Sequence, residues 1–149
     1  MKKLVTAACA LAAGMAMATG VESANIVGYT TATLSQQWTI LGVNFTAVDG
    51  SNLKIQDALP YVDGMTKGAN VNTADQIQIQ NASGGYDTYY MSNGKNAKGG
   101  TVDNLEGKWA KGTATTPTTD SIPAGKGAWY NRRGDTDFNI TIARPYTIE

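Results

Sequence analysis

The sequence predicts an all-β fold: an antiparallel β-sandwich or a partly closed barrel with one short helix. Three observations lead to this prediction. Apolar and polar residues alternate with the period of two that is typical of strands, as in Gln76–Gln80. Turn-forming residues, including many of the 17 glycines, separate these runs at short intervals. The 149 residues suffice for one domain with one hydrophobic core.

Residues 1–23 are predicted to be a secretory signal peptide that forms a helix and is removed on export. Lys2 and Lys3 give a positive start, and an uncharged run over 4–18 follows them. The run is too short for a membrane span of about 20 residues. An A-x-A-like cleavage site lies at 16–18. We therefore expect a single domain over 24–149, exported by a bacterium to the periplasm, cell surface or medium.

Two strands and a short helix are expected first in the mature chain. Residues 27–34 alternate β-branched and aromatic residues with smaller ones, which predicts a strand. Residues 38–45 are apolar on both faces, which predicts a strand at the centre of a sheet, with Gly42 as a bulge or close approach. Residues 53–59 have helical spacing, and Pro60 ends that helix.

The clearest predicted unit is a hairpin. Gln76–Gln80 alternates glutamine with isoleucine, a turn-forming loop over 81–85 follows, and Tyr86–Met91 returns. Ile77 and Ile79 should face the core and the three glutamines should point outward. A strand lined with amides also has the composition of an assembly edge.

The last third of the chain combines a long loop with a second predicted hairpin. Residues 92–120 are rich in glycine, threonine and asparagine, and a loop of this length is often functional. Residues 127–131 and 138–142 read as strands around a turn at 133–135. Phe138, Ile140 and Ile142 share one face of the second of these strands.

The composition excludes several classes of function. The chain has no histidine, which removes the commonest catalytic base and metal ligand. Its single cysteine, Cys9, lies in the predicted signal peptide, so the mature chain would carry no thiol. A net charge of zero argues against a nucleic-acid partner. We expect a protein that is not an enzyme; paired aspartates in a cleft would be needed for the alternative, a small hydrolase.

The segment Ile122-Pro123-Ala124-Gly125-Lys126-Gly127-Ala128-Trp129-Tyr130 follows four earlier motifs, and the order of these motifs resembles a loose group of exported bacterial all-β surface and secreted modules. These modules share a Gly-Asn-Pro opening and a later Ile-x-Pro-Gly-x-Gly-Phe strand. Here residues 43–45 read Val-Asn-Phe where Gly-Asn-Pro is usual. The resemblance implies a sandwich-like module outside the cytoplasm and implies no catalytic residues. The matching segments lie at 40–45, 53–60, 74–79, 84–90 and 122–130.

Aromatic residues are the main candidate ligand-binding groups. Aromatic faces beside amides suit the stacking of sugar rings. Trp109, in the long loop, is the best candidate for exposure, with Tyr89 and Tyr90 as its partners. Core packing is favoured for Trp38 and Trp129, because alternation along a strand buries every second side chain.

A calcium site is a second hypothesis, and no other cofactor is expected. Asp135, Asp137 and Asn139 alternate at the start of a strand and offer the oxygen ligands that calcium prefers, although a solvated hairpin flank is the favoured interpretation.

The first functional expectation is an exported, non-catalytic β module with a structural or cell-surface role, which associates with itself or with another surface protein. The alternative is a carbohydrate-binding module with an aromatic platform, whose partner is a polysaccharide. A membrane is expected to be involved only through the signal peptide during export.

Overall fold

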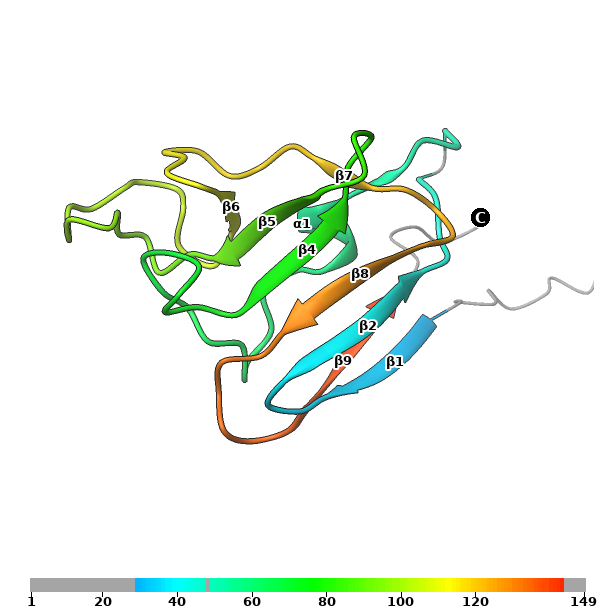
Figure 1. The fold of residues 1–149 in the computed structure, drawn as a ribbon, viewed down its shortest axis with the longest axis horizontal. Coiled ribbons are helices and arrows are strands. Elements are labelled where there is room, and N and C mark those ends of the chain that lie inside the picture. Colours follow the sequence, from blue (N-terminus) through cyan, green and yellow to red (C-terminus); the bar gives the residue numbers. More distant parts are fainter. Residues whose placement is uncertain (1–28, 48, 144–149) are drawn as a thin grey trace, which may run out of the picture.

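The computed structural model describes residues 29–47 and 49–143 and shows an all-β protein (Figure 1). The predicted signal peptide lies outside these residues. The described part contains nine strands and one short helix, α1: β1 Tyr29–Leu34, β2 Trp38–Val43, β3 Leu53–Lys54, α1 Ile55–Ala58, β4 Gln76–Gln80, β5 Tyr86–Met91, β6 Trp109–Lys111, β7 Ser121–Ile122, β8 Lys126–Asn131 and β9 Phe138–Ala143. No helix in the described residues has the length and apolarity of a membrane span.

The strands form one large and two small antiparallel sheets. The large sheet has the order β2-β8-β4-β5-β6, and the small sheets pair β1 with β9 and β3 with β7. In Figure 1, α1 and β9 lie behind the large sheet. The side chains of the β1–β9 sheet and of α1 join those of the large sheet in one core, which gives a sandwich-like arrangement.

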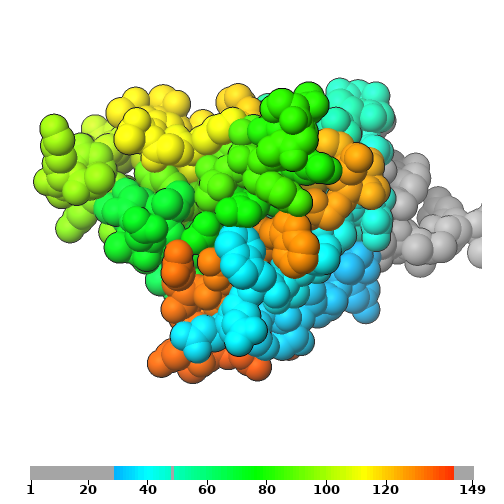
Figure 2. Space-filling view, viewed as in Figure 1, coloured from blue at the N-terminus to red at the C-terminus, as the bar shows by residue number. Residues whose placement is uncertain are grey.

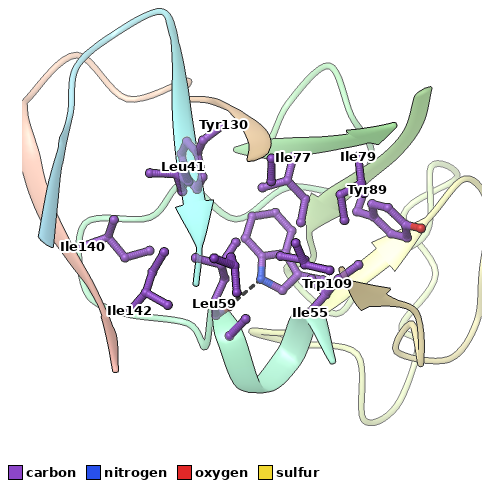
Figure 3. Close-up of a cluster of buried hydrophobic side chains, with 14 of the residues drawn as sticks. Leu41, Ile55, Leu59, Ile77, Ile79, Tyr89, Trp109, Tyr130, Ile140 and Ile142 are labelled. Atoms are coloured by element: carbon purple, nitrogen blue, oxygen red, sulfur yellow. Dashed lines mark hydrogen bonds between the residues drawn. The ribbon is translucent and has the colours of Figure 1, made fainter. Parts of the chain in front are cut away.

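The core lies between the inner face of the large sheet and these covering elements (Figure 3). Ile77 of β4 and Tyr130 of β8 point into it from the sheet, and Ile140 of β9 points into it from the opposite layer. Trp109 lies in the middle and meets Tyr130 edge-on, with ring centroids 6.1 Å apart. This packing is the main source of stability, because apolar burial dominates folding.

Several predicted elements are confirmed. β4 and β5 pair across the loop at 81–85, and both isoleucines of β4 are buried. The Asn81 side-chain oxygen accepts backbone N–H bonds from Ser83 and Gly85, which explains why this loop closes. The helix is confirmed in a shorter form, Ile55–Ala58, because Leu53–Lys54 pairs with β7 instead.

The hairpin predicted from residues 127–131 and 138–142 is wrong. Both strands exist, but β8 pairs with β2 and β4 whereas β9 pairs with β1 in the other layer. The connection is held by Arg132, whose guanidinium donates to the carbonyl oxygens of Gly64 (2.7 Å) and Thr136 (2.6 Å). This anchor leads the chain from one layer to the other instead of back along the same sheet.

Two predictions about position within the sheet are also wrong. β2 was expected to be central, but it lies at one end of the large sheet. The alternative that the amide-lined strand β4 forms an assembly edge is contradicted as well, because β4 lies between β8 and β5. Gln76 points outward yet is buried, and its side-chain nitrogen donates to the carbonyl of Val71 at 3.1 Å. Side-chain periodicity identifies faces, not neighbours, which explains both errors.

A buried polar network fixes the end of β4. Asp75 is fully buried and accepts hydrogen bonds from the Tyr130 hydroxyl (2.7 Å) and from the backbone N–H groups of Thr66 (3.1 Å) and Arg133 (2.7 Å). The guanidinium of Arg132, also buried, lies 3.6 Å from the same carboxylate. A buried charge needs such partners, so the network ties three segments together.

Candidate functional site

The outer face of the large sheet is assigned from strand register, because paired residues of antiparallel strands point to the same side. It is arranged in three rows that cross the strands. The first row runs Trp38, Asn131, Gln76, Tyr90 and Ala110; the second runs Ile40, Trp129, Gln78 and Thr88; the third contains the paired Gly42 and Gly127 and the paired Gln80 and Tyr86.

One end of this face is covered by loops. A small second core forms there from Tyr90, Ala110, Ala74 and Leu105, with Val71 and Val102 packed against it. Leu105 and Val102 belong to residues 92–120, so part of that segment folds back over the sheet. The predicted loop also contains β6, which pairs with β5.

The rest of the outer face is open and carries large apolar side chains. Ile40 is 59% exposed, Tyr86 52%, Trp38 44% and Trp129 37%. Figure 2 looks onto the same side of the molecule as Figure 1 and shows the cyan atoms of the β2 segment next to the orange atoms of the β8 segment, with the green strands beside them. We call Trp38, Trp129, Tyr86 and Gln78 the aromatic platform.

The aromatic platform lines a shallow groove of about 350 Å³. Gln78 lies opposite Trp129 on one neighbouring strand and opposite Thr88 on the other, where Tyr86 is its diagonal neighbour, so the amide has an aromatic side chain near it on each side. Exposed aromatic rings offer apolar faces, and the amide offers both a hydrogen-bond donor and an acceptor. A ligand with apolar ring faces and hydroxyl edges matches both.

In the third row, the paired Gly42 and Gly127 leave the backbone beside the platform uncovered by side chains. A Cβ at Gly127 would lie 3.2 Å from Cγ2 of Ile40, and one at Gly42 would meet only the Asn44 side chain, at 3.9 Å. Glycine in a strand often marks a place where another molecule approaches the backbone closely. Because Gly42 and Gly127 have no side chains, the surface next to Ile40 and Trp129 is recessed.

The whole outer face, as assigned from register, consists of uncharged residues. An ionic ligand would be held by opposite charges, as in bidentate arginine–carboxylate pairs. The face therefore favours a neutral ligand.

The aromatic residues predicted to bind a ligand are not exposed. Trp109 is fully buried, and its indole N–H donates to the Leu59 carbonyl at 2.6 Å (Figure 3). Tyr89 faces the core while its hydroxyl donates to Asp120 at 2.6 Å. Tyr90 is buried under the covering loops. These assignments fail because Trp109 belongs to β6, whose inner face is core, and not to a surface loop.

Trp38 and Trp129, for which core packing was favoured, belong to the open platform instead. Alternation correctly separates Trp129 from Tyr130, but it is Tyr130 that faces the core. The sequence carries one partial signal for the platform: residues 38–45 are apolar on both faces. The same pattern also fits a strand that is buried on both sides, so it does not show that one face stays exposed.

The residues of the calcium hypothesis lie on the surface. Asp135, Asp137 and Asn139 are exposed, and Asn139 Oδ1 already accepts a hydrogen bond from Thr33 Oγ1 at 2.8 Å. In residues 29–47 and 49–143, no three His, Cys, Asp or Glu side chains gather closely enough to hold a metal ion. Nothing in the geometry adds to that hypothesis.

A second hollow lies among the loops and contains acidic residues. Its volume is about 520 Å³, and Asp103 and Glu106 are among its lining residues. The Lys67 ammonium hydrogen-bonds Glu106 at 2.7 Å and lowers the pKa of that carboxyl. A glycosidase acid needs a raised pKa, so Glu106 has the opposite shift.

Asp87 and Asp120 are the other carboxylates that share a neighbour. Both form ion pairs with Lys111, at 2.8 and 3.6 Å, so each carboxylate is partnered by the same cation. The hydrogen bond from Lys111 lowers the pKa of Asp87, which keeps this carboxylate ionised and away from an acid role.

Comparisons of the chain with protein-family models, with curated proteins and with solved structures returned no match. The geometry and chemistry of the aromatic platform are therefore the basis for assigning a function.

Proposed function

We propose that this protein is an exported, non-catalytic β module that binds neutral carbohydrate on the open part of its large sheet. One observation supports the proposal most: two tryptophans and a tyrosine, all exposed, line one groove together with an amide. Pyranose rings stack their C–H faces on aromatic rings, while their hydroxyls exchange hydrogen bonds with amides.

The solvent exposure of these aromatic side chains also supports a binding role. Large apolar side chains that are exposed together beside a groove are more typical of an interaction site than of an ordinary protein surface. Gln78 at the centre favours a ligand that combines apolar faces with hydroxyls. The N-terminal segment, with its lysines and apolar run, supports export to a compartment where polysaccharides occur.

The test is affinity electrophoresis of the purified chain in gels that contain neutral polysaccharides, such as β-glucan, mannan, xylan and chitin derivatives. At least one polymer should retard the wild-type chain, and the same polymer should retard Trp129→Ala clearly less. Tyr29→Ala is the matched control, because Tyr29 is an exposed aromatic residue on β1 of the other sheet. If no polymer retards the chain, the proposal is wrong.

Self-association is a second candidate, and one observation favours it. Ile40 is the most exposed large hydrophobic residue on this face and lies on β2, which has a neighbour on only one side in the described part of its sheet. Unpaired strand edges promote pairing between copies. Light scattering after size-exclusion chromatography distinguishes the two: dimers that Ile40→Lys dissociates would assign the face to a second copy of this chain.

A further inference from the structure

We infer that the platform takes an internal segment of a linear, neutral polysaccharide, whose chain crosses strands β2, β8, β4 and β5. This inference rests on the proposed function and specifies its ligand. The four platform residues lie on four successive strands of the sheet, in the order Trp38, Trp129, Gln78 and Tyr86. The path of the ligand thus runs across the strands.

The length of this path indicates several sugar units. Neighbouring strands are about 4.8 Å apart, so three intervals from β2 to β5 amount to about 14 Å. Trp38 lies in the first row and Tyr86 in the third, so the path is oblique and longer than this minimum. One pyranose ring covers only a fraction of that span, and consecutive linked rings are needed to contact every platform residue.

Among residues 29–47 and 49–143, both ends of the path are open. β2 is the last strand at one side of the sheet, and Trp38 is 44% exposed there. At the other side, β6 pairs only with Tyr89–Met91, which leaves β5 without a neighbouring strand beside Tyr86 in the described residues. A site that recognised chain ends would need a wall at one end. This geometry lets the chain continue in both directions.

The platform alternates two kinds of contact along the path. Trp129 and Tyr86 offer stacking surfaces on either side of Gln78, whose amide can bond hydroxyls of the unit between them. The uncharged outer face disfavours uronic acids and sulfated sugars. Neutral hexose or N-acetylhexosamine chains are therefore the expected ligands.

The experiment is calorimetric titration with β-1,4-linked oligomers of glucose, mannose and N-acetylglucosamine, each from two to six units long. Affinity for the best series should rise with length and then level off once the chain spans Trp38 to Tyr86. Conversion of the reducing end to an alditol should leave hexamer affinity unchanged, because an internal segment is bound.

Variants along the path separate its centre from its ends. Trp129→Ala should weaken binding at every length by about tenfold or more, since a stacking contact of this size corresponds to about one factor of ten. Trp38→Ala and Tyr86→Ala should weaken the hexamer by a similar factor and leave the shortest bound oligomer unaffected. Tyr29→Ala should bind as wild type does, and thermal unfolding checks that each variant is folded.

Two kinds of failure are distinguishable. If oligomers bind but affinity does not depend on length, or if alditol conversion abolishes binding, the internal-segment inference is overturned and the proposed function stands. If no oligomer of any series binds and no polymer retards the chain, the proposed function fails as well.

Discussion

Trp109 and Trp129 lie in the same sheet but have opposite surroundings. Trp109 is fully buried on the inner face, with its ring against Tyr130 and its N–H bonded to Leu59. Trp129 is 37% exposed on the outer face, where a groove borders its side chain. The fold supplies the Trp109 indole with both apolar packing and a hydrogen-bond acceptor. Trp129 and Trp38, in contrast, leave apolar area in contact with solvent. A binding function is therefore expected at aromatic residues that the fold leaves partly exposed, and not at those it buries.

The largest expected effect is on the buried side of this comparison. Trp109→Ala should lower the free energy of unfolding by about 3–5 kcal/mol, because it opens a cavity in the core. The indole hydrogen bond to Leu59 is lost as well. Guanidinium denaturation monitored by circular dichroism measures the change. A loss below about 1 kcal/mol would contradict the role of Trp109 as the centre of the core.

Removal of one buried hydroxyl should have the next largest effect. Tyr130→Phe deletes the hydrogen bond to Asp75 and leaves a buried carboxylate with one donor fewer. The expected loss is about 1.5–3 kcal/mol, the usual range for bonds to charged groups. Urea denaturation checks this value, with Tyr29→Phe as a control whose exposed ring should make the substitution neutral.

Alkaline pH should act through the same tyrosine. Burial, and then the neighbouring Asp75, raise the pKa of Tyr130 above its usual value near 10. Because the unfolded chain loses this proton first, stability is complete below about pH 10 and falls as the pH rises further, by about 1.4 kcal/mol per pH unit and group. Burial and the bond to Asp120 raise the pKa of Tyr89 in the same direction.

Urea midpoints between pH 8 and pH 11 test this dependence. Tyr130→Phe should show a shallower alkaline decline than wild type, because phenylalanine does not titrate. A decline of the same slope in both proteins would assign the effect to other groups.

The smallest change in stability is expected on the open face. Trp38→Ala and Trp129→Ala remove rings that are partly exposed and partly packed, so each should lower the free energy of unfolding by about 1–2 kcal/mol, less than Trp109→Ala does. The same variants should lose carbohydrate affinity, which sharpens the contrast with Trp109. Paired denaturation and binding curves measure both quantities, and a loss as large as that of Trp109→Ala would mean that the open face is structural.

Much of the fold was predictable because alternation sets which side chains share a face. The hairpin of β4 and β5, with its buried Ile77 and Ile79, follows from residues adjacent in the chain. The partners of β8 and β9 did not follow, since they depend on Arg132 and on contacts with Gly64, almost 70 residues away. Local patterns carry no information about such distant anchors.

The type of candidate site could be predicted from the sequence, but the residues that form it could not. The sequence predicts an aromatic platform with amides as one alternative, but it points to Trp109, Tyr89 and Tyr90 as its members, and all three are buried. A tryptophan among glycines and threonines resembles a surface residue until a strand such as β6 places it against a core. Trp38 and Trp129 had the signal of apolar strand residues, which is shared by core positions.

The sequence by itself determined that the chain forms short alternating strands, and that Trp129 and Tyr130 point in opposite directions, because strand geometry sends successive side chains to opposite faces. It also determined the neutral charge and the lack of histidine. Only the tertiary structure decided which face became core and which stayed open. Burial depends on what covers a face, and here the cover comes from β1, β9, α1 and the loops around Val71 and Val102, whose positions against the sheet are not specified by the alternation within each strand.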